Sequence, residues 1–252
     1  MGLLGSLVVC AVCAFFVGGI PFGFVIARAK GIDIRRVGSG NIGATNVSRA
    51  LGKKYALLVF FLDFLKGALS VLAAAYLCGS PDLTLFPVSD KPSVLTLVNE
   101  VLKKSPQSVN QFSETALLCG TVAGAFAVLG HCFSPYLKFH GGKGIATSAG
   151  VTLMLIPLPF LVSIAIWVLI LFLFRYVSLA SICAAFSLPI AFALMYRLHT
   201  HRYFWILAYC LLITVVVIAK HIPNIKRLVF KKEPKIGRKK EAEKQDEQNI
   251  PA

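Results

Sequence analysis

The sequence predicts an all-α polytopic membrane protein with seven transmembrane helices, and three observations lead to this fold class. Apolar residues make up 57% of the 252 residues and charged residues only 15%, a composition far from that of a soluble globular domain. Long runs without ionised side chains recur along the chain. Most of the 26 lysines and arginines lie between these runs or after the last one. We therefore expect repeated membrane crossings, with the charge kept in loops and a tail.

The number of crossings follows from the length of the apolar runs. About 17–25 apolar residues suffice to cross the hydrocarbon core of a bilayer. The stretch 147–176 is too long for one straight span and contains Pro157 and Pro159, so we expect two short helices that turn at the prolines. The other expected crossings are residues 3–28, 55–78, 115–136, 178–196 and 203–220.

The distribution of basic residues orients these crossings. Assigning loops to alternate sides puts twenty of the 26 lysines and arginines on one side and five on the other, with Lys66 inside a span. The positive-inside rule then places the N-terminus outside and the C-terminus in the cytoplasm. A cleaved signal peptide is the rival interpretation of residues 1–29. It is disfavoured because Arg28 and Lys30 follow the apolar run and no basic residue precedes it, the reverse of a signal peptide.

Residues 1–230 are predicted to form one transmembrane domain, interrupted by an extracytoplasmic insertion at 79–113 that is rich in turn residues. Residues 231–252 mix both charge signs and contain few apolar residues, so we expect a disordered, charged cytoplasmic tail. No internal repeat is evident along the chain. Inverted repeats are common in transporters, so this observation weakens a transport function.

The seven cysteines lie in or at the edges of the expected spans, where cysteine behaves as a small apolar residue. An odd number offers no disulfide framework. Cys10 and Cys13 match the C-x-x-C spacing, but they lie in a lipid-facing helix pattern with no histidine nearby. We therefore predict neither a metal site nor a redox function for them.

Residues 38–49 have the composition of a phosphate-binding loop, because glycines permit tight curvature and expose backbone N–H groups. The spacing also matches the G-x-G-x-x-G motif of dinucleotide folds, but that motif requires a βαβ unit and the flanking segments here are membrane-length helices. A flexible loop without a ligand is the alternative. The glycines are Gly38, Gly40 and Gly43, the polar side chains are Ser39, Asn41, Thr45 and Asn46, and Arg49 adds a fork for phosphate oxygens.

A second glycine-rich segment contains Gly141, Gly142, Lys143 and Gly144. It lacks the spacing and the following Ser or Thr of a nucleotide-binding P-loop, so nucleotide hydrolysis is not indicated. A lysine among glycines can still reach a phosphate without crowding, and the helix expected to follow adds partial positive charge at its N-terminus. The alternative for Lys143 is a basic residue that only fixes membrane orientation.

A third candidate segment lies at the C-terminal end of the last expected span. His221 and Asn224 are three residues apart, with the spacing of one helix face, and Lys220, Lys226 and Arg227 surround them. Pro223 predicts that the helix ends or kinks at this point. A histidine at a membrane boundary can also be a simple interfacial residue.

Asp63 and Lys66 lie three residues apart inside the second expected span. Charged side chains are costly in lipid, so we expect the two to pair or to face the interior of the bundle. A structural ion pair is the first interpretation, and an active-site function is the alternative.

Together with residues 175–181, these segments closely resemble the bacterial acyl-phosphate:glycerol-3-phosphate acyltransferase family of the PlsY type. The resemblance covers nearly the whole chain in order, through residues 18–23, 37–52, 130–131, 141–144 and 221–228. Two departures are the long 79–113 insertion and Lys220, which stands where the family usually has an arginine. Lysine cannot form the same bidentate fork.

The resemblance implies an enzyme of the bacterial cytoplasmic (inner) membrane with its active site on the cytoplasmic face. It would transfer an acyl group from acyl phosphate to the 1-hydroxyl of sn-glycerol 3-phosphate, giving lysophosphatidic acid and phosphate. Neither a metal nor another cofactor is implied, and the expected partners are membrane lipid and the two substrates, without nucleic acid. We expect a monomer. The implied catalytic residues are Ser39, Arg49, Lys143, His221 and Asn224, with Ser181 and the two glycine-rich loops binding phosphate.

The candidate segments contain no Asp or Glu to serve as a general base. An acyl phosphate is already activated, so the protein has mainly to position it and stabilise charge. The phosphate of glycerol 3-phosphate, whose second pKa is about 6, can take the hydroxyl proton itself. His221 as the base is the competing mechanism. The alternative function is an organophosphate transporter, which would hold its substrate near the membrane midplane rather than at one face.

Overall fold

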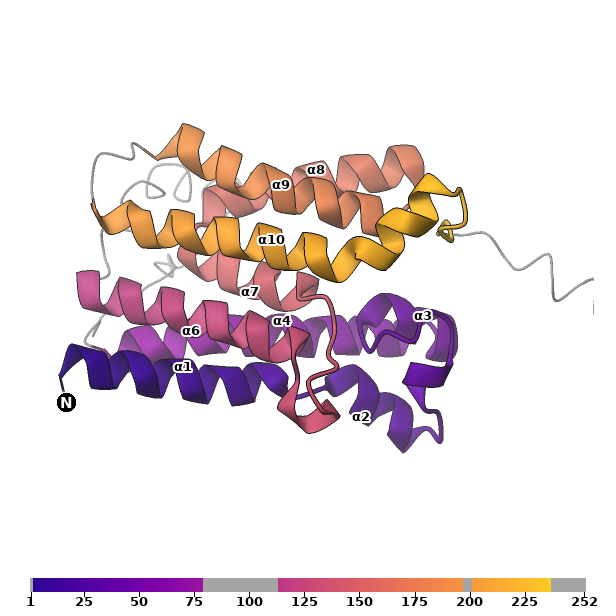
Figure 1. The fold of residues 1–252 in the computed structure, drawn as a ribbon, viewed down its shortest axis with the longest axis horizontal. Helices are drawn as coiled ribbons and strands as arrows, with labels where there is room; N and C mark the ends of the chain where they lie inside the picture. Colours follow the sequence, from indigo (N-terminus) through magenta and orange to yellow (C-terminus); the bar gives the residue numbers. More distant parts are fainter. Residues whose placement is uncertain (1, 79–112, 197–200, 237–252) are drawn as a thin grey trace, which may run out of the picture.

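The computed structural model describes residues 2–78, 113–196 and 201–236, and every regular element in these ranges is helical (Figure 1). Nearly all of the predicted insertion, and residues 237–252 of the predicted tail, lie outside the described residues. The α-helices are α1 Leu3–Gly19, α2 Phe22–Ala29, α3 Ala44–Leu51, α4 Lys53–Leu77, α6 Glu114–Cys132, α7 Ile145–Leu155, α8 Pro157–Phe174, α9 Val177–Met195 and α10 His201–Val229. Two short 3-10 helices are η1 Ile34–Arg36 and η2 Pro135–Leu137.

Six helical segments of the described chain have the length and composition of membrane spans, which confirms the predicted all-helical, multi-pass class. They are Leu3–Ala29, Lys53–Leu77, Glu114–Leu137, Pro157–Phe174, Val177–Met195 and Tyr203–Val229. The remaining predicted crossing corresponds to α7. With 11 residues, α7 is about 16 Å long, whereas the hydrocarbon core is about 30 Å thick.

Prolines determine where these segments break, because proline lacks the N–H that continues a helix. The first span divides into α1 and α2 around Pro21. The predicted turn within 147–176 is confirmed, since α7 ends at Leu155 and α8 starts at Pro157. Pro223 behaves differently, because α10 continues past it to Val229. Figure 1 shows α10 bending near this end, so the helix bends there and does not stop.

The helices run roughly parallel to one axis, and consecutive long helices alternate in direction (Figure 1). Helix α6 contacts α1, α4, α7 and α10, while α9 packs between α8 and α10. The largest buried apolar cluster lies among α4, α6, α7, α9 and α10 and includes Val128, Val151, Phe192 and Ile213. Figure 1 shows α3 and the C-terminal end of α10 at one end of the bundle, and the α6–α7 connection in the same half, closer to the middle.

Two reciprocal glycine contacts bring the backbones of α1 and α6 close together. A Cβ atom built on Gly18 would lie 2.1 Å from the Ala127 carbonyl oxygen, and one built on Gly130 would lie 2.1 Å from that of Phe15. Gly67 and Gly150 make the equivalent contact between α4 and α7, at 2.2 and 2.0 Å from backbone oxygens. Lipid offers no hydrophobic driving force between helices, so such close packing is a main source of association.

We expect Gly130→Ala to destabilise the protein by about 1–3 kcal/mol, because the new methyl group meets backbone atoms of α1 that cannot move aside. Gly120→Ala is a matched control on the same helix. Its Cβ would lie 3.3 Å from Cγ1 of Val71, a side chain that can shift. Thermal unfolding of both variants in the same detergent measures the difference. Equal melting temperatures would contradict the proposed backbone contact.

Candidate active site

A buried triad of ionisable side chains, Asp63, Lys66 and His131, lies between α4 and α6, and each residue is at most 4% exposed. Lys66 Nζ lies 2.8 Å from Asp63 Oδ1 and 3.0 Å from His131 Nδ1. His131 Nδ1 lies 3.5 Å from the same carboxylate oxygen. Although Asp63 Oδ1 is close to both groups, it receives no hydrogen bond of good geometry. The predicted Asp63–Lys66 ion pair is confirmed, and His131 joins it as a third member.

The buried triad also holds two pieces of irregular backbone. Lys66 Nζ donates a hydrogen bond to the Ile20 carbonyl at 2.8 Å, in the break between α1 and α2, where the same oxygen also accepts the Phe22 N–H at 3.2 Å. On the other side, residues 141–144, here called the glycine loop, lie directly against His131. The Gly142 N–H donates to the His131 carbonyl at 2.9 Å, and a Cβ on Gly142 would lie 2.0 Å from His131 Nε2.

Close packing and backbone geometry therefore explain the glycines of this loop. A Cβ on Gly141 would lie 2.0 Å from the His131 carbonyl oxygen, so no larger residue fits there. Gly144 caps α7 with a φ of 82°, a left-handed conformation that favours glycine. Lys143 lies between these glycines and is half-buried. Its loop packs against the buried triad.

Lys143 meets the third candidate segment directly. Its ammonium donates a hydrogen bond to Asn224 Oδ1, and Asn224 Nδ2 donates to Glu233 Oε1 at 2.7 Å. Arg227 Nε donates to the other oxygen of Glu233, also at 2.7 Å. A chain of four polar side chains thus links the glycine loop to the end of α10 and to the residues that follow it.

Glu233 is the member of this chain that sequence reasoning missed. It belongs to the segment predicted to be a disordered tail, yet it is buried, and its carboxylate also accepts a hydrogen bond from Ser178 of α9 at 2.7 Å. Burial alone would raise its pKa, but the hydrogen bonds from Asn224, Ser178 and Arg227 hold the pKa of Glu233 below its ordinary value. The only available signal was a single glutamate among lysines just after the last span.

Arg49 brings the first candidate segment to the same place. It is exposed on α3, and its charge interacts with those of Glu233, Arg227 and Lys143. Partial burial lowers the pKa of the guanidinium, and the neighbouring Arg227 adds to this, while Glu233 opposes it. Cations from α3, the glycine loop and α10 therefore lie within electrostatic range of one another.

The loop that precedes α3 is organised by Asn46, which is 1% exposed. Asn46 Oδ1 accepts the Ser39 N–H at 2.9 Å, and Nδ2 donates to the carbonyls of Ile34 and Val37. Both N–H groups of this amide are used, so Asn46 shapes the loop and has none left for a ligand. Gly38 and Gly40 have φ values of 60° and 69°, a left-handed conformation that favours glycine. Asn41 Oδ1 accepts the Gly43 N–H at 3.1 Å.

His221 and Ser181 occupy buried positions next to this region. His221 Nδ1 lies 2.8 Å from the Val217 carbonyl, so Nδ1 carries a proton and Nε2 is left to face other partners. His221 interacts electrostatically with Lys143 and Glu233. Ser181 accepts a hydrogen bond from Trp167 Nε1 at 3.2 Å and lies one helical turn beyond Ser178.

Some of the predicted site residues contact one another, whereas others have no hydrogen bond to Lys143. Arg49, Lys143, His221 and Asn224 interact with one another or with Glu233. Within the described ranges, no hydrogen bond joins Ser39 or Ser181 to Lys143. Ser39 and Thr45 are exposed, which leaves their hydroxyl groups accessible.

The electrostatic balance of the site favours an anion. Arg49, Lys143 and Arg227 outnumber Glu233, the one carboxylate of the hydrogen-bonded chain. Burial lowers the pKa of Lys143 to about 8, with Glu233 opposing this shift and Arg227 and Arg49 adding to it. At neutral pH Lys143 is therefore still an ammonium, held among other cations and suited to binding phosphate oxygens.

Comparison with known proteins gives one consistent family. The sequence profile described as glycerol-3-phosphate acyltransferase matches residues 8–231. The chain is 38% identical over 220 residues to a glycerol-3-phosphate acyltransferase of Aquifex aeolicus, which covers 87% of this chain and 94% of that protein. It is 39% identical over 229 residues to the protein of the same name from Desulforamulus reducens, covering 90% and 94% of the two chains.

Two solved structures have the same fold. Both are crystal structures of PlsY (YgiH), described as an integral membrane glycerol 3-phosphate acyltransferase. The glycerol 3-phosphate form superposes with a TM-score of 0.72 at 36% identity, and the lysophosphatidic acid form with 0.70 at 35%. Each comparison covers 92% of this chain and 96% of the other.

We expect the affinity of the site for sulfate, an anion that does not titrate near neutrality, to fall as the pH rises through about 8. Lys143 is charged below its pKa and neutral above it, so affinity should be nearly constant below pH 7 and drop by up to about tenfold per pH unit above 8. Calorimetric titration across pH 6–10 measures this. Lys143→Arg stays charged and should remove the pH dependence. The same pH dependence in that variant would contradict the role of Lys143.

Proposed function

The chain belongs to the glycerol-3-phosphate acyltransferase family, and from this membership we propose the complete reaction and the residues that catalyse it. The protein is a multi-pass membrane enzyme that acylates glycerol 3-phosphate to lysophosphatidic acid, the first acylation step of phospholipid synthesis. In our proposal the acyl donor is an acyl phosphate, the acceptor is the 1-hydroxyl, and inorganic phosphate is the second product. The catalytic residues are Ser39, Arg49, Lys143, His221 and Asn224.

The observation that carries this proposal is the convergence of Arg49, Lys143 and Asn224 from three separate elements at one end of the bundle. An acyl phosphate and glycerol 3-phosphate each contain a phosphate group. Three cations around a single buried carboxylate suit two such groups better than one. The exposed Ser39 hydroxyl and the backbone of the two glycine-rich loops add hydrogen-bond donors for phosphate oxygens.

The donor we propose also fits the chemistry of the side chains. Glu233, the buried carboxylate of the site, accepts hydrogen bonds from Ser178, Asn224 and Arg227, which leaves it poorly placed to remove a proton. A donor that is already activated makes fewer demands, because Arg49 and Lys143 then only need to stabilise the departing phosphate. The phosphate dianion of glycerol 3-phosphate takes the proton from the 1-hydroxyl. The hydroxyl oxygen bonds to the acyl carbon as the bond to phosphate breaks.

We further propose seven crossings, with the N-terminus outside and the C-terminus and active site in the cytoplasm. The alternating helix directions support this topology, as does the excess of lysine and arginine at the active-site end. The glycine loop rests on His131 inside the third span, so α7 starts below the membrane surface and has less than the full thickness to cross. We also propose that the enzyme works as a monomer in the bacterial inner membrane. Nothing in the proposed reaction requires a cofactor.

A transporter of organophosphates is not favoured. The cationic groups lie at the C-terminal ends of α3 and α10 and in the connection before α7, all in the half of the bundle that holds α3 (Figure 1), and not spread over both halves.

One assay tests the donor. Purified protein should convert glycerol 3-phosphate to lysophosphatidate with palmitoyl phosphate and remain inactive with palmitoyl-coenzyme A, because the site binds the donor through its phosphate. Product formation is followed by thin-layer chromatography of labelled glycerol 3-phosphate. Turnover with the coenzyme A ester alone would overturn the proposed donor while leaving the acyltransferase assignment intact.

Two variants separate the proposed mechanism from its competitor. Arg49→Ala removes a cation that stabilises the departing phosphate, and kcat should fall by about 10²–10³. His221→Ala should keep kcat within about tenfold of the parent if the substrate supplies the base, whereas loss of a general base costs about 10²–10⁴. Steady-state kinetics with palmitoyl phosphate measures both. A loss of a hundredfold or more in His221→Ala would assign the base to Nε2 of His221.

A further inference from the structure

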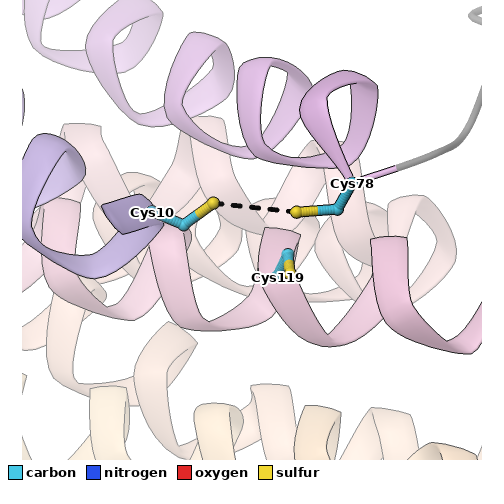
Figure 2. A group of neighbouring side chains, drawn as sticks. All are labelled: Cys10, Cys78 and Cys119. Carbon is cyan, nitrogen blue, oxygen red and sulfur yellow. Dashed lines mark hydrogen bonds between the residues drawn. The ribbon is translucent and has the colours of Figure 1, made fainter. Parts of the chain in front are cut away.

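Three cysteines, from α1, from the end of α4 and from α6, lie close together (Figure 2). Cys10 lies in α1, Cys78 directly follows α4, and Cys119 lies in the second turn of α6. The Sγ atoms of Cys10 and Cys78 are 3.9 Å apart, and all three sulfur atoms lie within 4.8 Å of one another. These three residues are called the sulfur cluster below.

The two cysteines of the C-x-x-C motif do not lie in the same site in the tertiary structure. Cys13, its second cysteine, is exposed on α1, whereas Cys10 is 7% and Cys119 is 0% exposed. The pair that are neighbours in sequence are therefore not the pair that share a site. Among the residues that the structure describes, the sulfur cluster is the one group of three side chains with metal-binding atoms at this spacing.

The spacing suits a single ion bound by all three sulfurs. With metal–sulfur bonds of about 2.3 Å, three sulfurs arranged in a plane around one ion stand about 4.0 Å apart. The Cys10–Cys78 distance already has this value, and the other two sulfur–sulfur distances are at most 4.8 Å. Small rotations of the side chains would complete the triangle. A disulfide would instead require the closest pair to approach to about 2.05 Å.

The number of ligands selects the ion. Cys10 and Cys119 belong to a buried apolar cluster with Ala14, Ala74, Ala123 and Ala127. Among the described residues, this place offers three sulfur ligands. A structural Zn²⁺ site takes four ligands. Soft sulfur ligands select Cu⁺ among the monovalent metal ions of the cell.

We propose that Cys10, Cys78 and Cys119 form a binding site for one Cu⁺ ion. Each thiol loses its proton to water as its sulfur binds the ion, and copper is not oxidised. Cys78 provides the entrance, because it is partly exposed at the end of α4. Residue 119 is twelve residues from His131 along α6, or about 18 Å. The bound ion therefore acts as a link between α1, α4 and α6 and takes no part in acyl transfer.

The test uses the full-length protein, reduced, metal-free and kept without oxygen in detergent. Titration with Cu⁺ against a coloured Cu⁺ chelator should show one ion bound per chain, with release of protons as the thiols become thiolate ligands. Each of Cys10→Ala, Cys78→Ala and Cys119→Ala should weaken binding at least about tenfold, since even the loss of a residue that only orients a metal ligand costs that much. Acyltransferase activity, which the cluster does not touch, reports that each variant is folded.

Cys13→Ala is the matched control, because it removes a cysteine from the same helix without touching the cluster, and it should bind Cu⁺ like the parent. Unchanged binding in Cys119→Ala would overturn a site of three ligands, and an equal loss in Cys13→Ala would reduce the binding to adventitious thiols. Finding a Cys10–Cys78 disulfide in protein whose thiols were blocked at cell lysis would also overturn the proposal, because the ligands would then be consumed by oxidation.

Discussion

The arrangement of the active site depends on a charge pair buried inside the membrane domain. Asp63 and Lys66 would each be costly in lipid alone, and removing one would leave the other unpaired, so the two are held together. Lys66 has hydrogen-bonding capacity to spare and uses it on the Ile20 carbonyl, in the break before Pro21. His131 completes the group and presents its ring to Gly142. The position of the glycine loop, and hence of Lys143, follows from this packing.

A second polar network builds on the first. Lys143 contacts Asn224, Asn224 contacts Glu233, and Glu233 contacts Arg227. The carboxylate thus holds two cations near each other without neutralising the site, which is the condition for binding anionic substrates at neutral pH. It also ties the residues after α10 to α9 through Ser178. The end of the chain's last helix is in this way part of the site, although its sequence looks like the start of a solvated tail.

The glycines of the two loops have two structural reasons, which are backbone curvature and close packing. Gly38 and Gly40 were assigned to a phosphate loop because of their spacing, and their positive φ angles agree with a tightly curved backbone. Gly141 and Gly142 were assigned in the same way, but the structure shows that His131 leaves no room for a side chain at either position. Gly38 combines both reasons, because a Cβ at this position would also collide with Asn46 Oδ1. Only coordinates distinguish the two.

The amino-acid sequence alone determined the membrane class, the positions of most helices and the ion pair of Asp63 and Lys66, because these depend on local hydropathy, on proline and on spacing along one helix. It also determined the family, since the cationic segments recur in a characteristic order. The three-dimensional arrangement decided what sequence spacing cannot express. His131 joins an ion pair 65 residues earlier in the chain, Glu233 holds Asn224 and Arg227, and Cys10 meets Cys78 and Cys119 instead of Cys13. Each of these contacts joins segments distant in sequence, and a side chain's long-range partners are set by how helices pack, not by its neighbours along the chain.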